Sequence, residues 1–315
     1  MKLLLGIFLF LLIYPVTSQD YDFVIAADGS GDFTTVQSAI DAVPHLRNNR
    51  TTIFIKPGTY KERLMLPPTK VNVSFIGEDP ATTIITFNSH ANMLNRFGEK
   101  MGTSGSSMFY VYGDGFEATN ITFENSAGPV GQAVAVRVDG DRVKFDNCRF
   151  LGNQDTLYPH GKQSRQYYKN CYIEGTVDFI FGWSTAYFDK CEIFCKTRGY
   201  ITAASTEEDS KYGFVFNECK IGGSAPVGSF YLGRPWRPYA QTVFINCEMS
   251  EVIKPEGWDP WGKDSNKETA FYAEYGSKGK GGDSSQRVEW SHQLTPAELA
   301  NYSLEKVLGD WNPNE

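Results

Sequence analysis

The sequence predicts an all-β protein folded as a parallel β-helix, a solenoid of short strands, with a short helix at each end. Three observations lead to this fold class. A short motif recurs seven times along the chain. The segments that carry it are rich in Phe, Ile, Val and Tyr and lack helical spacing, which favours strands. The chain has 315 residues, 41% of them hydrophobic, so one such domain can hold a sizeable core.

The N-terminus has the layout of a secretory signal peptide. Lys2 precedes an apolar run over residues 3–13, and short residues follow this run. The run is shorter than the roughly 18 apolar residues that a transmembrane helix needs. We therefore expect residues 1–18 to be a cleaved signal peptide. Residues 19–315 should form one domain that is secreted or periplasmic, without stable membrane insertion.

Two elements are predicted before the repeats begin. In "DFTTVQSAIDAV", residues 32–43, the apolar residues have helical spacing, and Thr34 and Gln37 are spaced as a capping box. The stretch "DGSGD" before this helix is predicted to be a turn, because it lacks the glutamate that would complete a calcium loop. The next stretch, "TTIFIK" at residues 51–56, has the pattern of a strand.

The repeat occupies the middle of the chain. In chain order it reads "NVSFIG", "NITFEN", "NCRFLG", "NCYIEG", "KCEIFC", "ECKIGG" and "NCEMSE". The residues at its second position are Val73, Ile121, Cys148, Cys171, Cys191, Cys219 and Cys247. Their separations are 48, 27, 23, 20, 28 and 28 residues, the first being about two periods. A period in the twenties with strand-forming residues predicts a parallel β-helix, in which the second positions stack in one inward column.

Five of the six cysteines fall in this column. An even number of cysteines in an exported protein is also compatible with disulfides. We favour packing, because Val73 and Ile121 occupy the same column and buried cysteine behaves as a small apolar residue. Cys195 lies outside the column and could pair with a neighbour.

The C-terminal stretch "LTPAELANYSLEKVLG" predicts another helix. Thr295 would be its N-cap, Pro296 its first residue and Glu298 its third. Together with the helix over residues 32–43, it would cover the exposed ends of the solenoid. Residues 254–285, rich in Gly, Lys, Asp and Trp, are predicted to be loops.

Two aspartates share one position of the repeat. Asp155 lies seven residues after Cys148, and Asp178 lies seven residues after Cys171. If both turns follow the same path, the two carboxylates are about one strand spacing apart. Asp178 stands in the apolar run "GTVDFIFG", which predicts a buried strand where an ionised carboxylate needs a partner. Two such carboxylates should differ in pKa, leaving one acid and one carboxylate, which is a hydrolytic arrangement.

Other classes of site have little support in the sequence. The formal net charge is −7, which disfavours a nucleic-acid partner. The four histidines are scattered and no G-x-S-x-G elbow accompanies them, which disfavours a Ser-His-Asp hydrolase. No paired histidines or C-x-x-C motif has metal-ligand spacing, so we expect no metal and no cofactor.

Six motifs in order resemble one family, the pectin methylesterases. They are "GSGDFTTVQSAIDAVP", "PGTYKE", "GQAVAV", "QDTLY", "GTVDFIFG" and "YLGRPW", and they span most of the mature chain. The resemblance implies a single-stranded right-handed parallel β-helix that hydrolyses the methyl esters of galacturonate units. It also implies that the substrate is pectin, as methylated homogalacturonan, and we expect a monomer.

The resemblance implies a role for each residue of the catalytic set. Asp178 would be the nucleophile. Asp155 would act first as general acid and then as general base. Gln132 and Gln154 would donate hydrogen bonds to the oxyanion. Arg234 would hydrogen-bond Asp178, lower its pKa and hold it ionised.

Aromatic residues should line the groove, because sugar rings present apolar faces. Phe181 and Trp236 are the best candidates, since they flank the proposed catalytic residues, and Tyr158 and Trp258 are weaker ones. Arg198, seven residues after Cys191, is a further candidate for contact with a substrate carboxylate.

The chain departs from the family pattern at two places. Trp183-Ser184-Thr185 follows "GTVDFIFG" where many members have Asn and small residues, and Ala204 stands where glutamine is frequent. Both changes could alter which methylation pattern or side-chain decoration is accepted.

Two alternative functions stay open on the sequence. A galacturonan-cleaving hydrolase or lyase could also use two carboxylates, although the chain has no acidic calcium cluster. A non-catalytic pectin-binding β-helix could retain the groove without turnover. Binding without methanol release would support it.

Overall fold

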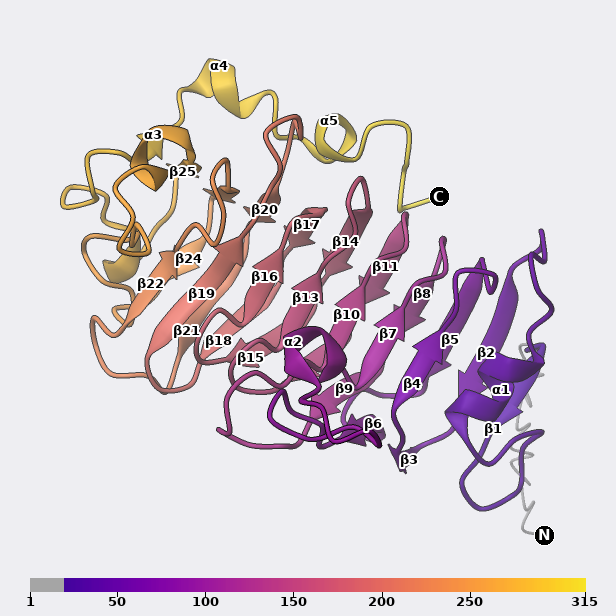
Figure 1. Cartoon of the computed structure of the whole chain (residues 1–315). Coiled ribbons are helices and arrows are strands. Elements are labelled where there is room, and N and C mark those ends of the chain that lie inside the picture. Colours follow the sequence, from indigo (N-terminus) through magenta and orange to yellow (C-terminus); the bar gives the residue numbers. More distant parts are fainter. Residues whose placement is uncertain (1–19) are drawn as a thin grey trace, which may run out of the picture.

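The computed structural model describes residues 20–315, which wind into a solenoid of three all-parallel sheets (Figure 1). Each full turn of the chain contributes one strand to each sheet, in the order A, B, C as named below. This confirms the predicted parallel β-helix. The predicted signal peptide lies outside the described residues. Among residues 20–315, no helix is both long enough and apolar enough to cross a bilayer.

Sheet A has eleven strands and runs the length of the molecule. Its strands are β1 (Phe23–Ile25), β2 (Thr51–Ile55), β5 (Val73–Gly77), β8 (Glu117–Thr119), β11 (Val143–Asp146), β14 (Arg165–Lys169), β17 (Thr185–Asp189), β20 (Phe214–Asn217), β23 (Gln241–Ile245), β25 (Phe271–Tyr275) and β26 (His292–Gln293).

Sheet B has eight strands and sheet C has seven. Sheet B comprises β3 (Gly58–Lys61), β6 (Thr83–Phe87), β9 (Thr122–Asn125), β12 (Arg149–Leu151), β15 (Tyr172–Gly175), β18 (Glu192–Cys195), β21 (Lys220–Gly223) and β24 (Glu248–Met249). Sheet C comprises β4 (Leu64–Leu66), β7 (Phe109–Val111), β10 (Val136–Val138), β13 (Leu157–Pro159), β16 (Ile180–Gly182), β19 (Gly199–Ala204) and β22 (Phe230–Gly233).

The helices are short. They are α1 (Val36–Ala42), α2 (Gly102–Gly105), α3 (Asn266–Thr269), the 3₁₀ turn η1 (Lys280–Gly282), α4 (Pro296–Leu299) and α5 (Leu304–Leu308).

In six of the seven repeats, the first position forms the corner between sheets A and B. One residue per turn adopts a left-handed conformation there, with φ between 50° and 59°. These residues are Asn120, Asn147, Asn170, Lys190, Glu218 and Asn246. Asn72 is also left-handed, but it precedes β5 of sheet A, where Val73 pairs with Thr51. The predicted place of Val73 in the column is therefore wrong. Asparagine tolerates this conformation better than most residues, which explains why it is frequent at this position. The corner asparagines also bond between turns, since Nδ2 of Asn147 donates to Oδ1 of Asn120 at 2.7 Å.

The cysteine column lies directly after this corner and points into the core. All five column cysteines are at most 1% exposed, and they are free thiols. Their Sγ atoms approach carbonyl oxygens of the preceding turn, for example Cys191 Sγ and Tyr168 O at 3.3 Å. Cys195 is buried and free as well, so the packing interpretation is confirmed and the pairing considered for Cys195 does not form.

Sheet A adds an aromatic ladder to the same core. The rings of Tyr168, Phe188, Phe216 and Phe244 stack in series, with centroids 4.6, 4.4 and 4.5 Å apart. This is close to the spacing of neighbouring strands, so each turn adds one ring to the stack. The continuous apolar interior makes the turns keep their register, and that register positions the site described below.

The N-terminal helix forms, but its cap differs from the prediction. Thr35, not Thr34, is the N-cap, and its hydroxyl accepts a hydrogen bond from the Ser38 amide. The predicted capping box of Thr34 and Gln37 is therefore wrong by one residue. The apolar face of α1, including Val36 and Ile40, packs into the core at the N-terminal end of the solenoid.

The C-terminal capping box is confirmed. Thr295 accepts from the Glu298 amide, and the Glu298 carboxylate accepts from the Thr295 amide at 2.8 Å. Helices α4 and α5 lie along the outer side of sheet A (Figure 1), where Val307 and Leu308 pack against its tyrosines. At the C-terminal end, Trp290 packs against Tyr272 of the core.

The prediction of loops over residues 254–285 is wrong in part. This range contains β25, α3 and η1. Trp258 is 1% exposed and belongs to the core, where its Nε1 donates to Glu274 at 3.3 Å. It does not line a groove.

Candidate active site

The two aspartates lie on adjacent turns, as their shared repeat position predicts. Leu157 of β13 pairs with Ile180 of β16, and Asp155 and Asp178 each lie two residues before these partners. The Asp155 amide donates to the Val177 carbonyl at 3.1 Å. Both aspartates therefore stand at the same corner of consecutive turns, where sheet B leads into sheet C.

The prediction that Asp178 lies inside a strand is wrong. Strand β15 ends at Gly175 and β16 begins at Ile180, so Asp178 occupies the turn between them. Its φ is 53° and that of Asp155 is 64°, both in the left-handed region that aspartate tolerates. Gly175 is required here because a Cβ would lie 2.2 Å from Cβ of Phe179. The turn presents the Asp178 side chain outward while Phe179 stays in the core.

Arg234 is the partner of Asp178. Its Nε and Nη2 donate to the two carboxylate oxygens, each at 2.8 Å. This two-point geometry is the strong form of a charge-assisted hydrogen bond. The side chains are 19% and 9% exposed, so water screens the pair only weakly.

Two aromatic rings hold the guanidinium in place. The Arg234 Cζ lies 3.8 Å from the ring centroid of Tyr200 and 3.7 Å from that of Trp261. Its backbone amide donates to Thr202 O at 3.0 Å, which fixes the start of the loop after β22. Arg234 is thus a positioned residue and not a mobile surface arginine.

Burial acts on both carboxyl groups but with different results. Burial raises the pKa of Asp155 well above its usual value of 3.8, and the nearby charge of Asp178 raises it further. Burial also raises the pKa of Asp178, but hydrogen bonding and charge from Arg234 oppose that rise. The predicted lowering by Arg234 is present, but burial outweighs it, so the pKa of Asp178 lies above its ordinary value. The two groups still separate, and Asp155 holds its proton to higher pH.

The aspartates and Arg234 open into a pocket of about 280 Å³. The pocket is lined by Thr103, Gln132, Gln154, Asp155, Asp178, Phe181, Ala203, Arg234, Trp236 and Trp261. The backbones of Gln132 and Gln154 form a parallel bridge, which places the two side chains on neighbouring turns. Both amides reach the pocket, and their N–H groups can donate to a bound oxygen.

Most of the predicted site residues meet in this pocket. All five residues of the predicted catalytic set line it, together with Phe181 and Trp236. Tyr158 lies behind the pocket, where its ring stacks on Phe181 with centroids 4.0 Å apart. It is 2% exposed and supports the wall instead of facing a ligand.

The prediction for Arg198 is wrong. Ile180 pairs with Thr202, so the residue that follows Asp178 in register is Tyr200. Arg198 is exposed and does not line the pocket. Sequence reasoning missed Tyr200, Trp261 and Thr103. The only available signal was the tryptophan of the turn "DPWG", which could have marked Trp261 as a loop residue near the groove.

No group of three or more His, Cys, Asp or Glu side chains within residues 20–315 is arranged to hold a metal ion. The pocket therefore combines one carboxyl group that keeps its proton, one carboxylate paired with an arginine, two amide donors and an aromatic wall. These groups can attack a carbonyl, stabilise an oxyanion and transfer a proton.

Comparisons with known proteins agree with this geometry. The family model described as Pectinesterase matches residues 22–310. Pectinesterase 31 from Arabidopsis thaliana is 44% identical over 284 residues, which cover 88% of this chain and 89% of that protein. The pectin methylesterase from carrot has a TM-score of 0.85 at 35% identity and covers 92% of this chain and 93% of its own. A pectin methylesterase mutant in complex with a hexasaccharide has a TM-score of 0.83 at 32% identity, with 94% and 99% covered.

Proposed function

This chain belongs to the pectinesterase family and demethylesterifies pectin, and we propose that it does so through a covalent intermediate on Asp178. The substrate enters with the methyl-ester carbonyl of one galacturonate unit beside Asp178. Phe181 and Trp236 face the apolar side of the sugar ring.

In the first step, a carboxylate oxygen of Asp178 attacks the ester carbonyl carbon. The carbonyl oxygen becomes an oxyanion that accepts hydrogen bonds from the amides of Gln132 and Gln154. The carbon–oxygen bond to the methoxy group then breaks. Asp155 gives its proton to this leaving group, so methanol departs and an acid anhydride joins Asp178 to the sugar.

In the second step, Asp155 is a carboxylate and acts as general base. It removes a proton from a water molecule, whose oxygen attacks the sugar carbonyl of the anhydride. The bond to Asp178 breaks and the free galacturonate acid leaves. Asp178 is again a carboxylate paired with Arg234, and Asp155 is again protonated.

One observation carries this proposal. Asp155 and Asp178 occupy equivalent corners of adjacent turns, yet only Asp178 has a guanidinium on both of its oxygens. Burial without such a partner keeps the proton on Asp155. This difference supports the acid role proposed for Asp155 and the nucleophile role proposed for Asp178.

The test compares methanol release from highly methylated pectin by the parent protein, Asp178→Asn and Asp79→Asn. Asp79 is an exposed aspartate in the turn before β6 and serves as the matched control. Asparagine tolerates the left-handed conformation, so Asp178→Asn should fold and lose activity by roughly 10³-fold or more. The control should keep the parent rate.

Reducing ends and unsaturated products are measured in the same reactions. Chain cleavage without methanol would replace the proposed reaction by that of a hydrolase or lyase. Pectin binding without any product would leave a non-catalytic binding protein. Methanol release that survives in Asp178→Asn would refute the covalent mechanism.

Three further statements belong to this proposal. Residues 1–18 direct export, and residues 19–315 act outside the cell membrane as one domain. The enzyme works as a monomer; the catalytic pocket is complete within one chain, so the reaction needs no residue from a second copy. Cleavage by export machinery can be checked by sequencing the N-terminus of the secreted protein, and the oligomeric state by light scattering.

A further inference from the structure

The aromatic ladder of sheet A ends at a charged side chain. Its rings occupy one inward position on successive strands, and the last of them, Phe244, pairs in register with Glu274 of β25. A carboxyl group therefore takes the next place in the ladder, and its side chain is 2% exposed. An ionised carboxylate is costly at such a place unless another group compensates its charge.

Arg287 compensates the charge of Glu274. Its Nε and Nη2 donate to the two carboxylate oxygens at 2.8 and 3.0 Å. The Arg287 side chain is 4% exposed, so this is the most deeply buried ion pair within residues 20–315. Apolar residues of the same size often stabilise a core as well as such a pair does. We therefore looked for what the pair holds in place.

The pair fixes the loop of residues 250–262, which follows β24. Nη1 of Arg287 donates to the Pro255 carbonyl at 3.0 Å, and Nε1 of Trp258 donates to Glu274 at 3.3 Å. The Arg287 side chain also crosses the loop at Gly257, which has a φ of 72° and where a Cβ would lie 2.4 Å from Cδ of Arg287. The two charged groups thus contact the loop at three places within four residues.

The same loop continues to the catalytic arginine. The Asp259 amide donates to the Gly233 carbonyl at 3.1 Å, which ties the loop to the end of β22, directly before Arg234. Two residues further on, the Trp261 ring lies 3.7 Å from Cζ of Arg234. Trp261 follows Trp258 by only three positions, so the buried pair lies close along the chain to the ring that holds the guanidinium.

We propose that Glu274 and Arg287 are positioning residues for the reaction. Their buried pair holds the loop that keeps Trp261 on the guanidinium of Arg234, and so keeps the guanidinium on both oxygens of Asp178. Neither Glu274 nor Arg287 lines the catalytic pocket. The inference rests on the proposed function, in which ionised Asp178 attacks the ester.

The test replaces the pair by apolar residues, in Glu274→Met with Arg287→Met. No buried charge is left unpaired, so the melting temperature should stay close to that of the parent. The loop loses its bonds to the pair, while Asn266 still donates to the Pro260 carbonyl at 3.4 Å. A displacement of about 1 Å can cost roughly 10²-fold in rate, so a partly held loop should lower kcat/KM for methanol release by about 10-fold.

Two further measurements distinguish positioning from a structural role. The acid limb of kcat/KM, where Asp178 takes up its proton, should move to higher pH, because a displaced guanidinium opposes the effect of burial less. The other groups whose charges act on Asp178 or Arg234, namely Asp155, Asp259 and Tyr200, are unchanged. In the Arg234→Ala background, the same double substitution should change kcat/KM by less than about twofold, because the pair acts through Arg234.

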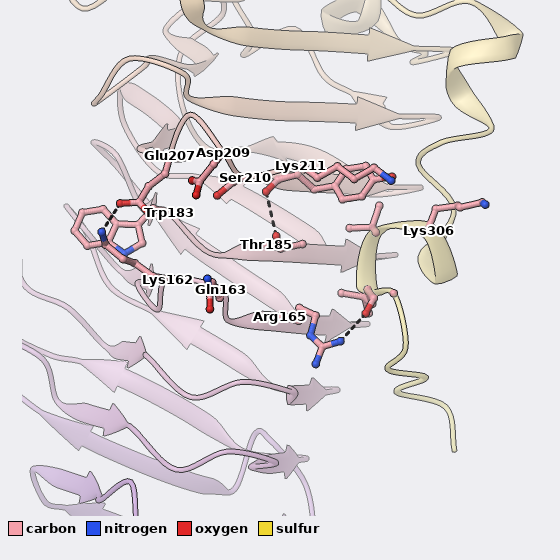
Figure 2. Close-up of a pocket in the computed structure, with 14 residues that line it drawn as sticks. Lys162, Gln163, Arg165, Trp183, Thr185, Glu207, Asp209, Ser210, Lys211 and Lys306 are labelled. Atoms are coloured by element: carbon pink, nitrogen blue, oxygen red, sulfur yellow. Dashed lines mark hydrogen bonds and ion pairs between the residues drawn. The ribbon is translucent and has the colours of Figure 1, made fainter.

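Arg165→Met is the matched control. Arg165 also pairs with a carboxylate, that of Asp141 at 2.7 Å, and also donates to a carbonyl of a distant segment, that of Leu308 at 3.0 Å (Figure 2). It does not line the catalytic pocket. Its replacement should lower the melting temperature and leave the acid limb in place.

Arg287→Lys is a second variant, for the case that the double substitution prevents folding. It keeps a charge beside Glu274 but loses the planar fork that also reaches Pro255, so its acid limb should move in the same direction. A parental rate and pH profile in either folded variant would overturn the proposal, as would a loss that persists in full in the Arg234→Ala background. Methanol release that survives in Asp178→Asn would instead refute the nucleophile, and the coupling of Arg287 to Arg234 is measured whichever group attacks the ester.

Discussion

Replacement of Arg234 by alanine tests the electrostatic basis of the mechanism. The substitution removes two hydrogen bonds of 2.8 Å from a carboxylate whose side chain is 9% exposed. Removal of one partner from a buried ion pair costs about 3–5 kcal/mol, because the other charge is left uncompensated. If the transition state loses the same free energy, then at about 1.4 kcal/mol per factor of ten kcat/KM near neutral pH should fall by roughly 10²–10⁴-fold.

The same change should move the pH profile. Asp178 must be ionised to attack the ester, and Arg234 is the group that opposes the effect of burial on its pKa. In Arg234→Ala, burial and the charge of Asp259 remain and both raise the pKa of Asp178, so the acid limb of kcat/KM moves to higher pH. The initial rate of methanol release, measured over a series of pH values, gives this limb directly.

A matched control separates this effect from the loss of any arginine. Arg50→Ala removes the partner of Glu117, in an ion pair whose side chains are 37% and 38% exposed. It should leave the pH profile unchanged. Arg234→Lys keeps the charge but loses the two-point geometry, so its acid limb should lie between those of the parent and Arg234→Ala. If Arg234→Ala lowers the rate equally at every pH and the acid limb stays in place, Arg234 does not keep Asp178 ionised.

Two more predictions concern the neighbours of Asp178. Burial raises the pKa of Asp155 well above its usual value of 3.8. At a pH between these two values, the folded protein holds a proton that the unfolded chain releases, so the free energy of unfolding falls as the pH rises through this range. Asp155→Asn cannot ionise and should raise the melting temperature at pH 7 but not near pH 3; equal shifts at both pH values would contradict the assignment. Gln132→Ala and Gln154→Ala should each lower kcat by about 10²-fold without changing the melting temperature, and an unchanged kcat would exclude that amide from the oxyanion site.

The sequence predicts the fold well because the recurring residues nearly all occupy the same corner of the solenoid. Each turn needs a residue in the left-handed conformation and then a small apolar residue, and these two positions are the ones that recur, for instance as Asn147-Cys148 and Asn170-Cys171. This recurring pair of residues therefore indicates which positions of successive turns stack on one another. Strand β25 was missed because the last turns leave this pattern and carry no cysteine at the corner.

The same alignment explains why one site prediction is right and another wrong. Cys148 and Cys171 are 23 residues apart, and so are the paired residues Leu157 and Ile180, so the shared offset places Asp178 beside Asp155. Cys171 and Cys191 are only 20 residues apart, whereas Ile180 and its partner Thr202 are 22 apart. The corner before sheet C is longer in this turn. Counting seven residues from Cys191 therefore reaches Arg198, which is two residues short of the position in register with Asp178. Tyr200 occupies that position.

The repeat alone cannot specify which of the two aspartates is the acid and which is the nucleophile. Asp155 and Asp178 have the same corner, the same left-handed backbone and nearly the same exposure, 6% and 7%. On the preceding turn, Asp155 lies beside Ala133 and Val134, and on the following turn Asp178 has Tyr200 in register. Arg234 reaches Asp178 from the end of β22, two turns further along, and so removes the symmetry of the pair. The difference between acid and nucleophile thus arises from the neighbours that the solenoid stacks on each side and not from the residue type or the corner itself.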